Sequence, residues 1–278
     1  MNIDTLDTKG FVAFPYPRML QEAVLRSLAS WRLFCELPLE AKHLLSGGDR
    51  INDFGYMRRK DTSPHADDKE IFHALRANYP LLLPKARHVG DLRAVGFIRS
   101  IDFLITHIAP TVRAFAHAVE QRYALPGFTD EVMGSSDFWT FRFLRYPKNS
   151  PTLAHAHADR GGFTFHLCET EGGGEYLGFD KTWRQWPVSR KRTIIFGSMG
   201  LQYRSENKIK ALWHRVSSEP TAIPERFAMV VFVDFQSSHR FHTEKYPHVQ
   251  QFTPGFNYNI AFPDLAQYFI ERAHPVPG

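Results

Sequence analysis

The hydrophobic pattern of this chain changes at Pro126-Gly127, and this change limits the fold more than any other feature. Before it, apolar residues recur at three- and four-residue steps from Ile98 to Val119, which is the spacing of a long amphipathic helix. After it, short β-rich segments are separated by Gly, Asn or Pro turns. At 278 residues the chain fits one large domain. We expect residues 1–130 to form a helical region and residues 131–278 to form a β core.

The β-rich half predicts a specific architecture. Six short segments read as strands, at residues 138–146, 162–168, 175–179, 192–196, 210–217 and 227–235. This frequency of short strands favours a sandwich or barrel. We therefore predict an α+β fold whose core is a double-stranded β-helix, or jelly roll, with the N-terminal helical region packed on one side.

Smaller features refine this expectation. The pattern predicts a short strand at 10–15, helix over 18–45 with a break at Leu37-Pro38, and a closing helix over Asp264–Ala273. Residues 50–90 look irregular, with a strand near Ile71. The long helix should kink at Pro110, because proline removes a backbone donor.

Composition excludes several classes of protein. The chain is 43% hydrophobic, which argues against disorder, and its two cysteines cannot form a disulfide framework. No signal sequence opens it and no apolar run reaches the length of a membrane span, so we expect a cytoplasmic protein that does not associate with a membrane. We also expect no obligate protein partner. The net charge is +5. We interpret its densest basic segment, Arg184–Arg192, as a solvated hairpin loop rather than a nucleic-acid patch.

A metal-ligand pattern lies in the β half. His157-Ala-Asp159 would point both side chains the same way on a strand, and His214 follows 55 residues after Asp159. Two imidazoles and one carboxylate suit a non-haem Fe(II) site that keeps open positions for O₂. The chain also has a second His-x-Asp at His65 and another candidate at His155. On spacing alone, ordinary polar residues at strand ends are the better interpretation.

The surroundings of these residues carry a resemblance. Residues 141–167 (FRFLRYPKNSPTLAHAHADRGGFTFHL) and 194–216 (IIFGSMGLQYRSENKIKALWHRV) resemble the iron-binding regions of isopenicillin N synthase-like 2-oxoglutarate/Fe(II) dioxygenases. Upstream, LFCELPLEAKHLL (33–45), GYM (55–57) and DDKEIF (67–72) are similar to the family's N-terminal region. The resemblance runs from about Gly10 to Arg272. Each motif is loose, but their order and spacing together are specific.

The resemblance implies an iron site made by His157, Asp159 and His214, with 2-oxoglutarate as cosubstrate. Asp159 argues against halogenation, because halogenating relatives lack this carboxylate. The family places Arg-x-Ser after the last histidine to bind the distal carboxylate of 2-oxoglutarate, and Arg226-Phe-Ala228 matches it without the serine hydroxyl. Tyr146, in the family's Tyr-Pro pair, is the second expected cosubstrate contact.

Two further arginines are candidate substrate contacts. If Tyr146 faces the pocket, strand alternation puts Arg142 there too. A buried guanidinium needs an anion, which is either a substrate carboxylate or an internal partner such as Glu175. Arg58 lies where relatives bring substrate contacts from the N-terminal region.

The sequence thus predicts an Fe(II)/2-oxoglutarate dioxygenase that oxidises a C–H bond of a small, anionic metabolite, by hydroxylation or desaturation. Two alternatives stay open. One is an iron-dependent oxidase or cyclase of the same fold that uses no 2-oxoglutarate, as isopenicillin N synthase works. The other is a non-catalytic jelly-roll binding protein, because a fold alone does not fix a function.

Overall fold

The computed structural model describes residues 1–47, 54–59, 69–148, 154–159, 161–187, 189–216 and 225–235. The predicted closing helix and the second His-x-Asp motif at His65 lie outside these residues. Within them the helices are α1 (Thr5–Lys9), α2 (Arg18–Cys35), α3 (Leu39–His43), η1 (Arg76–Asn78), α4 (Tyr79–His88), α5 (Leu92–Tyr123), α6 (Phe128–Gly134), η2 (Ser136–Phe138) and α7 (Met199–Arg204).

The strands form two antiparallel sheets. They are β1 (Phe11–Pro15), β2 (Gly55–Arg59), β3 (Lys69–Ala74), β4 (Thr140–Tyr146), β5 (Ala154–His157), β6 (Phe163–Glu169), β7 (Gly174–Leu177), β8 (Trp183–Gln185), β9 (Arg192–Gly197), β10 (His214–Val216) and β11 (Arg226–Val233). The seven-stranded sheet has the order β1-β9-β6-β11-β4-β3-β2, and the four-stranded sheet has the order β5-β10-β7-β8. The predicted mixture of helices and antiparallel sheet is confirmed. The large sheet takes strands from both sides of residue 130, so the two predicted regions share it.

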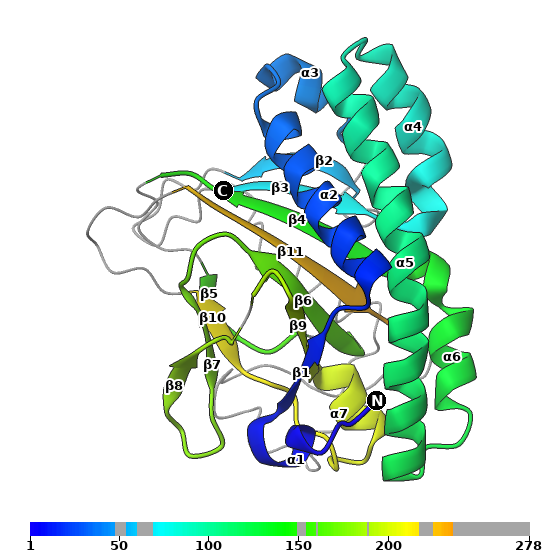
Figure 1. Ribbon diagram of the computed structural model, residues 1–278, viewed down its shortest axis with the longest axis vertical. Helices are drawn as coiled ribbons and strands as arrows, with labels where there is room; N and C mark the ends of the chain where they lie inside the picture. The colour runs from blue at the N-terminus through cyan, green and yellow to red at the C-terminus, as the bar shows by residue number, and fades with distance from the viewer. Residues whose placement is uncertain are drawn as a thin grey trace, which may run out of the picture.

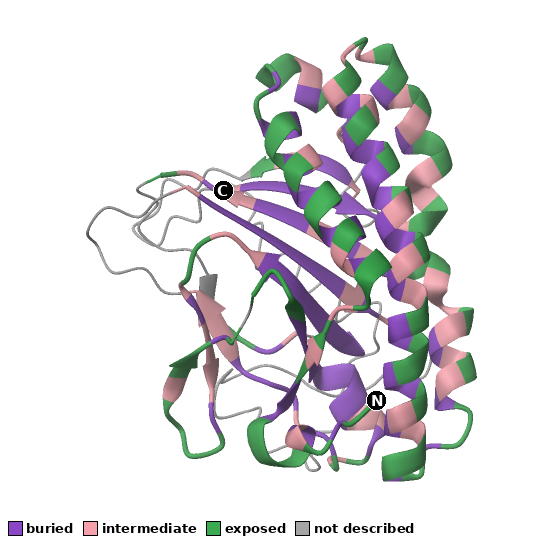
Figure 2. Ribbon diagram, in the orientation of Figure 1, coloured by how far each residue is buried: buried purple, intermediate pink, exposed green. Residues whose placement is uncertain are grey.

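Helices cover one face of the large sheet (Figure 1). α5 packs on α2, α4 and α6, and buried residues of these helices and of the sheet form one apolar core. Figure 2 colours the buried residues purple. α5 is long and apolar enough to cross a membrane, but half of its most apolar window is buried inside the molecule. A core helix has this property. It runs through Pro110 without interruption.

The other face of the large sheet carries a different set of side chains. Along β4, Phe141 and Phe143 join the helix-side core, whereas Leu144 and Tyr146 pack with Ala228 in a separate apolar cluster. β4 pairs with β11 so that Tyr146 lies opposite Arg226. Alternation along a strand therefore sorts these residues as the sequence predicted, with Leu144 and Tyr146 on the face that lies away from the helices.

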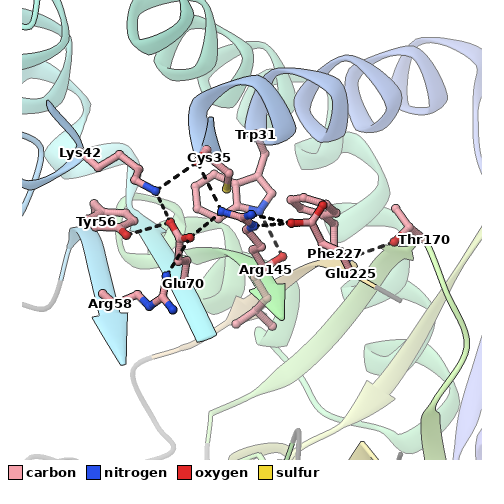
Figure 3. Close-up of polar contacts among 11 residues, drawn as sticks. Trp31, Cys35, Lys42, Tyr56, Arg58, Glu70, Arg145, Thr170, Glu225 and Phe227 are labelled. Carbon is pink, nitrogen blue, oxygen red and sulfur yellow. Dashed lines mark hydrogen bonds and ion pairs between the residues drawn. The ribbon is translucent and has the colours of Figure 1, made fainter. Parts of the chain in front are cut away.

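A buried ion cluster, which we call the Glu70 cluster, lies on the helix side (Figure 3). It consists of Lys42, Tyr56, Arg58, Glu70 and Arg145. The Glu70 carboxylate accepts hydrogen bonds from Lys42 (2.6 Å), Tyr56 (2.8 Å), Arg58 (3.2 Å) and Arg145 (2.6 Å), and Glu70 has no exposed surface. The cluster joins α3 to β2, β3 and β4 through side chains. It therefore fixes the edge of the large sheet against the helices.

Several local expectations differ from the structure. Residues 50–90, read as irregular, contain β2 and α4 as well as the predicted β3. Arg184, read as part of a loop, lies in β8. β5 ends at His157, so Asp159 follows the strand instead of lying on it. The strand predicted at 10–15 and the six predicted in the β-rich half are all present, shifted by a few residues at their ends.

Candidate metal centre

Three side chains predicted as ligands converge at the end of the small sheet. His214 on β10 lies directly opposite His157 on β5 in the strand register, and Asp159 follows two residues after His157. Nε2 of His157 lies 3.7 Å from Oδ1 of Asp159, and Nε2 of His214 lies 3.8 Å from the same oxygen. The three donor atoms all lie within 4.8 Å of one another. Cross-strand pairing thus brings His214 next to His157 and Asp159, although 55 residues separate Asp159 from His214 in the sequence.

Backbone contacts hold the Asp159 loop in place. The Asp159 carbonyl accepts a hydrogen bond from the amide of Met199, the first residue of α7, at 2.8 Å. A Cβ on Gly162 would lie 2.4 Å from the Val233 carbonyl oxygen, so only glycine lets this loop approach β11 so closely. The loop is therefore a fixed support for the carboxylate.

Hydrogen bonds also orient two of the ligand side chains. Thr164 on β6 donates to Oδ2 of Asp159 at 2.6 Å, which leaves Oδ1 directed at the two imidazoles. Nδ1 of His214 donates to the Leu212 carbonyl at 3.1 Å, so its Nε2 carries the free lone pair. Outer partners of this kind fix the tautomer and the angle of metal ligands.

The protonation states of Asp159 and His214 favour the binding of a metal cation. Burial alone would raise the pKa of Asp159, but the nearby His214, His157, Thr164 and Arg142 lower it overall. Burial lowers the pKa of His214 to about 4, against the opposing pull of Asp159. At neutral pH the pair is thus a carboxylate beside a neutral imidazole. These are the forms that bind metal, and a donor set of two imidazoles and one carboxylate fits Fe(II).

The Thr164 hydroxyl gives a first prediction. Thr164→Val keeps the shape but removes the hydrogen bond that orients Asp159, so we expect the affinity for Fe(II) to fall about 10- to 100-fold. Anaerobic metal titration measures this. Thr193→Val is the matched control, because Thr193 is equally buried and its hydroxyl donates to the backbone carbonyls of His166 and Ile194. Equal losses in the two variants would contradict the orienting role.

Arg226, the expected cosubstrate contact, lies at the start of β11 and is 1% exposed. Its guanidinium lies 5.1 Å from the centre of the Tyr146 ring, so the two expected cosubstrate contacts are neighbours. It also has an internal partner that the sequence analysis missed. Nη2 bonds the carboxylate of Glu169, the last residue of β6. Ala228, the departure from the family pattern, lies opposite Glu169 in the strand register.

Arg142 lies on the same face as Tyr146, as alternation predicted. Its Nε donates to Nε2 of His73 at 2.6 Å, and its guanidinium lies 4.7 Å from the centre of the Phe232 ring. Its charge helps to lower the pKa of Asp159, which places it close to the metal ligands. Glu175, the internal partner considered for it, instead bonds Arg215 at 2.6 Å.

Arg58 lies in β2 opposite Glu70, within the Glu70 cluster on the helix side of the sheet. Its contact with a substrate stays a prediction, and this position does not favour it. The sequence analysis also missed an aromatic side chain beside the metal ligands. Trp186 stacks on His166 at a ring distance of 5.6 Å and packs 5.9 Å from the His214 ring. Trp186 lies in the segment Arg184–Arg192, interpreted from the sequence as a solvated hairpin loop, so no feature of the sequence indicated this position.

No family model and no curated protein matches the sequence. Solved structures do match it. A Caulobacter crescentus protein assigned to the 2OG-Fe(II) oxygenase family has 19% identity and a TM-score of 0.73, over 97% of this chain and 92% of that chain. A full-length Neurospora crassa protein in complex with alpha-KG has 18% identity and a TM-score of 0.69, over 97% and 87%. The Arabidopsis thaliana dioxygenase for auxin oxidation 1, in complex with 2-oxoglutarate, has 16% identity and a TM-score of 0.62, over 84% and 86%.

These likenesses define the class of the fold. The chain has the fold of 2OG-Fe(II) oxygenases, and it carries a possible His-Asp-His metal site of the kind that such chemistry needs. The resemblance read from the sequence is confirmed at the level of fold.

Proposed function

We propose that this protein is an Fe(II)/2-oxoglutarate-dependent dioxygenase that oxidises a C–H bond in a small, anionic metabolite. One observation carries the proposal: the donor atoms of His157, Asp159 and His214 converge within 4.8 Å in a fold shared with such oxygenases. When bound, Fe(II) would supply the chemistry that couples decarboxylation of 2-oxoglutarate by O₂ to two-electron oxidation of the substrate. The two sheets would form the walls of a jelly roll around this site.

The chain's own residues would hold and orient the reactants. His157, Asp159 and His214 would occupy one face of the metal and leave the opposite face open. Arg226 would hold the distal carboxylate of 2-oxoglutarate, and the buried Tyr146 beside it would add its phenol. The apolar side chains of Leu144 and Ala228 would exclude water around that carboxylate and strengthen the charge contact.

The cosubstrate clamp gives a second prediction. Arg226→Ala should raise the dissociation constant for 2-oxoglutarate by more than about tenfold, because a lost charge-assisted contact costs roughly 1.5–3 kcal/mol. Anaerobic titration of the Fe(II) protein measures this, since chelation of the metal by 2-oxoglutarate gives a visible charge-transfer band. Arg184→Ala, at an exposed arginine paired with Asp180, is the control. Unchanged binding in Arg226→Ala would place the carboxylate elsewhere.

The substrate gives a third prediction. Arg142 lies on the same face of β4 as Tyr146, and its Nε donates to Nε2 of His73. A guanidinium on this face would attract an anionic group of the substrate. Arg142→Met should weaken substrate binding while the affinities for 2-oxoglutarate and iron stay nearly unchanged. Succinate release across a panel of carboxylated metabolites would find the substrate for this comparison. Efficient turnover of a wholly apolar substrate would contradict the anionic class.

Two observations favour a second candidate, an iron-dependent oxidase of the same fold that needs no 2-oxoglutarate. Arg226 already bonds the carboxylate of Glu169, and Ala228 lacks the hydroxyl that assists cosubstrate binding in the family. Anaerobic titration separates the two candidates. A charge-transfer band that saturates with 2-oxoglutarate supports the dioxygenase. Its absence from a protein that holds Fe(II) supports the oxidase.

A further inference from the structure

Glu169 is held between a guanidinium and an imidazole. Its carboxylate bonds Nη2 of Arg226 and lies 3.4 Å from Nε2 of His166, and the side chains of all three residues are nearly buried. A β-bulge between β6 and β11 produces this arrangement. The register shifts between Met229 and Val230, so His166 and Glu169 reach the same face of the sheet although they are three residues apart. Glu169 is therefore a built part of the Arg226 environment.

Hydrogen bonds within the protein already use two of the three nitrogens of the Arg226 guanidinium. Nε donates to the Glu171 carbonyl at 3.3 Å, and Nη2 bonds Glu169. Among the described residues, the buried Nη1 has no hydrogen-bond partner. A buried donor without a partner is costly, so Nη1 is where a ligand oxygen would be stabilised. A carboxylate that arrives there finds one donor edge instead of the full two-point fork.

The charge of Glu169 opposes a second anion. Burial alone would raise the pKa of Glu169, but the neighbouring His166 and Arg226 outweigh it and lower that pKa to about 2. Glu169 is thus ionised at neutral pH. Two carboxylates on one buried guanidinium repel each other, because like charges at close range disfavour the charged forms. Ala228, opposite Glu169, contributes no donor that would offset this repulsion.

We propose that Glu169 competes with the distal carboxylate of 2-oxoglutarate for Arg226, and so determines how strongly and how selectively this protein binds its cosubstrate. The proposal rests on the proposed function, because it assumes that Arg226 receives that carboxylate. It makes Glu169 a specificity-determining residue. The charge of Glu169 and the missing serine hydroxyl at Ala228 would then both weaken the binding of 2-oxoglutarate.

The decisive variant is Glu169→Gln. Its amide oxygen can still accept from Nη2, so Arg226 keeps its position while the competing charge disappears. We expect the dissociation constant of 2-oxoglutarate to fall at least about tenfold in anaerobic calorimetry of the Fe(II) protein, since one close charge pair changes affinity on that scale. Binding of 2-oxopentanoate, which has a methyl group in place of the distal carboxylate, should not change.

Two further variants separate this effect from others. Glu175→Gln removes a carboxylate that pairs with Arg215 on the small sheet, and it should leave 2-oxoglutarate binding unchanged. Ala228→Ser adds a donor without removing the charge, and it should tighten binding less than Glu169→Gln does. Its effect should grow when the two changes are combined, because the added hydroxyl then no longer acts against the charge of Glu169. If Glu169→Gln folds poorly, Ala228→Ser alone still tests the proposal, because tightening of about tenfold or more with Glu169 in place would contradict the competition.

The outcomes are distinguishable. Weaker binding of 2-oxoglutarate by Glu169→Gln would overturn the proposal and make Glu169 a positioning residue for Arg226. An equal gain for 2-oxopentanoate would also overturn it, because the effect would then not concern the distal carboxylate. If the wild type and every variant hold Fe(II) but bind no 2-oxoglutarate, both this proposal and the proposed dioxygenase fail together. If 2-oxoglutarate binds tightly and Glu169→Gln does not change its dissociation constant, only the proposed competition fails, and the proposed dioxygenase stands.

Discussion

Asp159→Ala is expected to abolish specific Fe(II) binding and, with it, all turnover. The carboxylate is the only anionic member of the three converging ligands, and it lies within 3.8 Å of both imidazole nitrogens. Its loss leaves two neutral donors, which is an incomplete set for this metal. Anaerobic titration with Fe(II) and measurement of bound iron after gel filtration would test this.

The control for Asp159→Ala comes from the second His-x-Asp motif. Asp67→Ala makes the same chemical change in His65-Ala-Asp67, which lies outside the described residues, and we expect it to leave one Fe(II) bound. His157→Ala and His214→Ala should both behave like Asp159→Ala. If Asp67→Ala loses the metal while Asp159→Ala keeps it, the wrong motif has been assigned.

The second large effect concerns stability. Glu70→Gln should lower the free energy of unfolding by about 3–5 kcal/mol, because it leaves Lys42 and Arg145 without a full counter-charge in a buried site. For a chain of this size that corresponds to a fall in melting temperature of roughly 10 °C. Thermal and urea unfolding would measure it. Glu225→Gln, at a partly exposed partner of Arg145, should cost far less.

The same cluster predicts a dependence on pH. Burial alone would raise the pKa of Glu70, but Lys42, Tyr56 and Arg145 outweigh it and lower that pKa. A carboxyl with a lowered folded-state pKa adds stability above its unfolded pKa, and this stability is lost as the pH falls through the folded value. The wild type should therefore lose part of its stability on acidification below about pH 4. Glu70→Gln should lose less over that window.

The sequence predicted the elements whose pattern repeats over many residues. α5 was predicted because apolar residues recur over many turns, and the strands because turn residues separate them. α4 lies in the stretch read as irregular, and it contains two prolines, Pro80 and Pro84. Pro80 lies in the first turn of α4, where the missing amide donor costs nothing. The predicted α+β class follows from patterns of this kind, whereas the pairing of the strands does not.

The candidate site was predictable only in part, for the same reason. His157, Asp159 and His214 could be named from motifs, and Arg142 could be placed by alternation from Tyr146. The pairing of Glu169 with Arg226 could not. Strict alternation from His166 puts Glu169 on the opposite face of β6, and only the bulge reverses it. A one-residue shift in strand register leaves no mark in a single sequence.

The two faces of β4 have a consequence for how this protein can diverge. Odd-numbered residues of this strand hold the sheet to its helices through Phe141, Phe143 and Arg145, whereas the even-numbered Arg142 and Tyr146 face the reactive side. A mutation at an even-numbered position can therefore alter the choice of ligand without disturbing the contacts between the sheet and its helices. Such a strand is a place where new specificities can be sampled by single substitutions, while the neighbouring residues keep the scaffold intact.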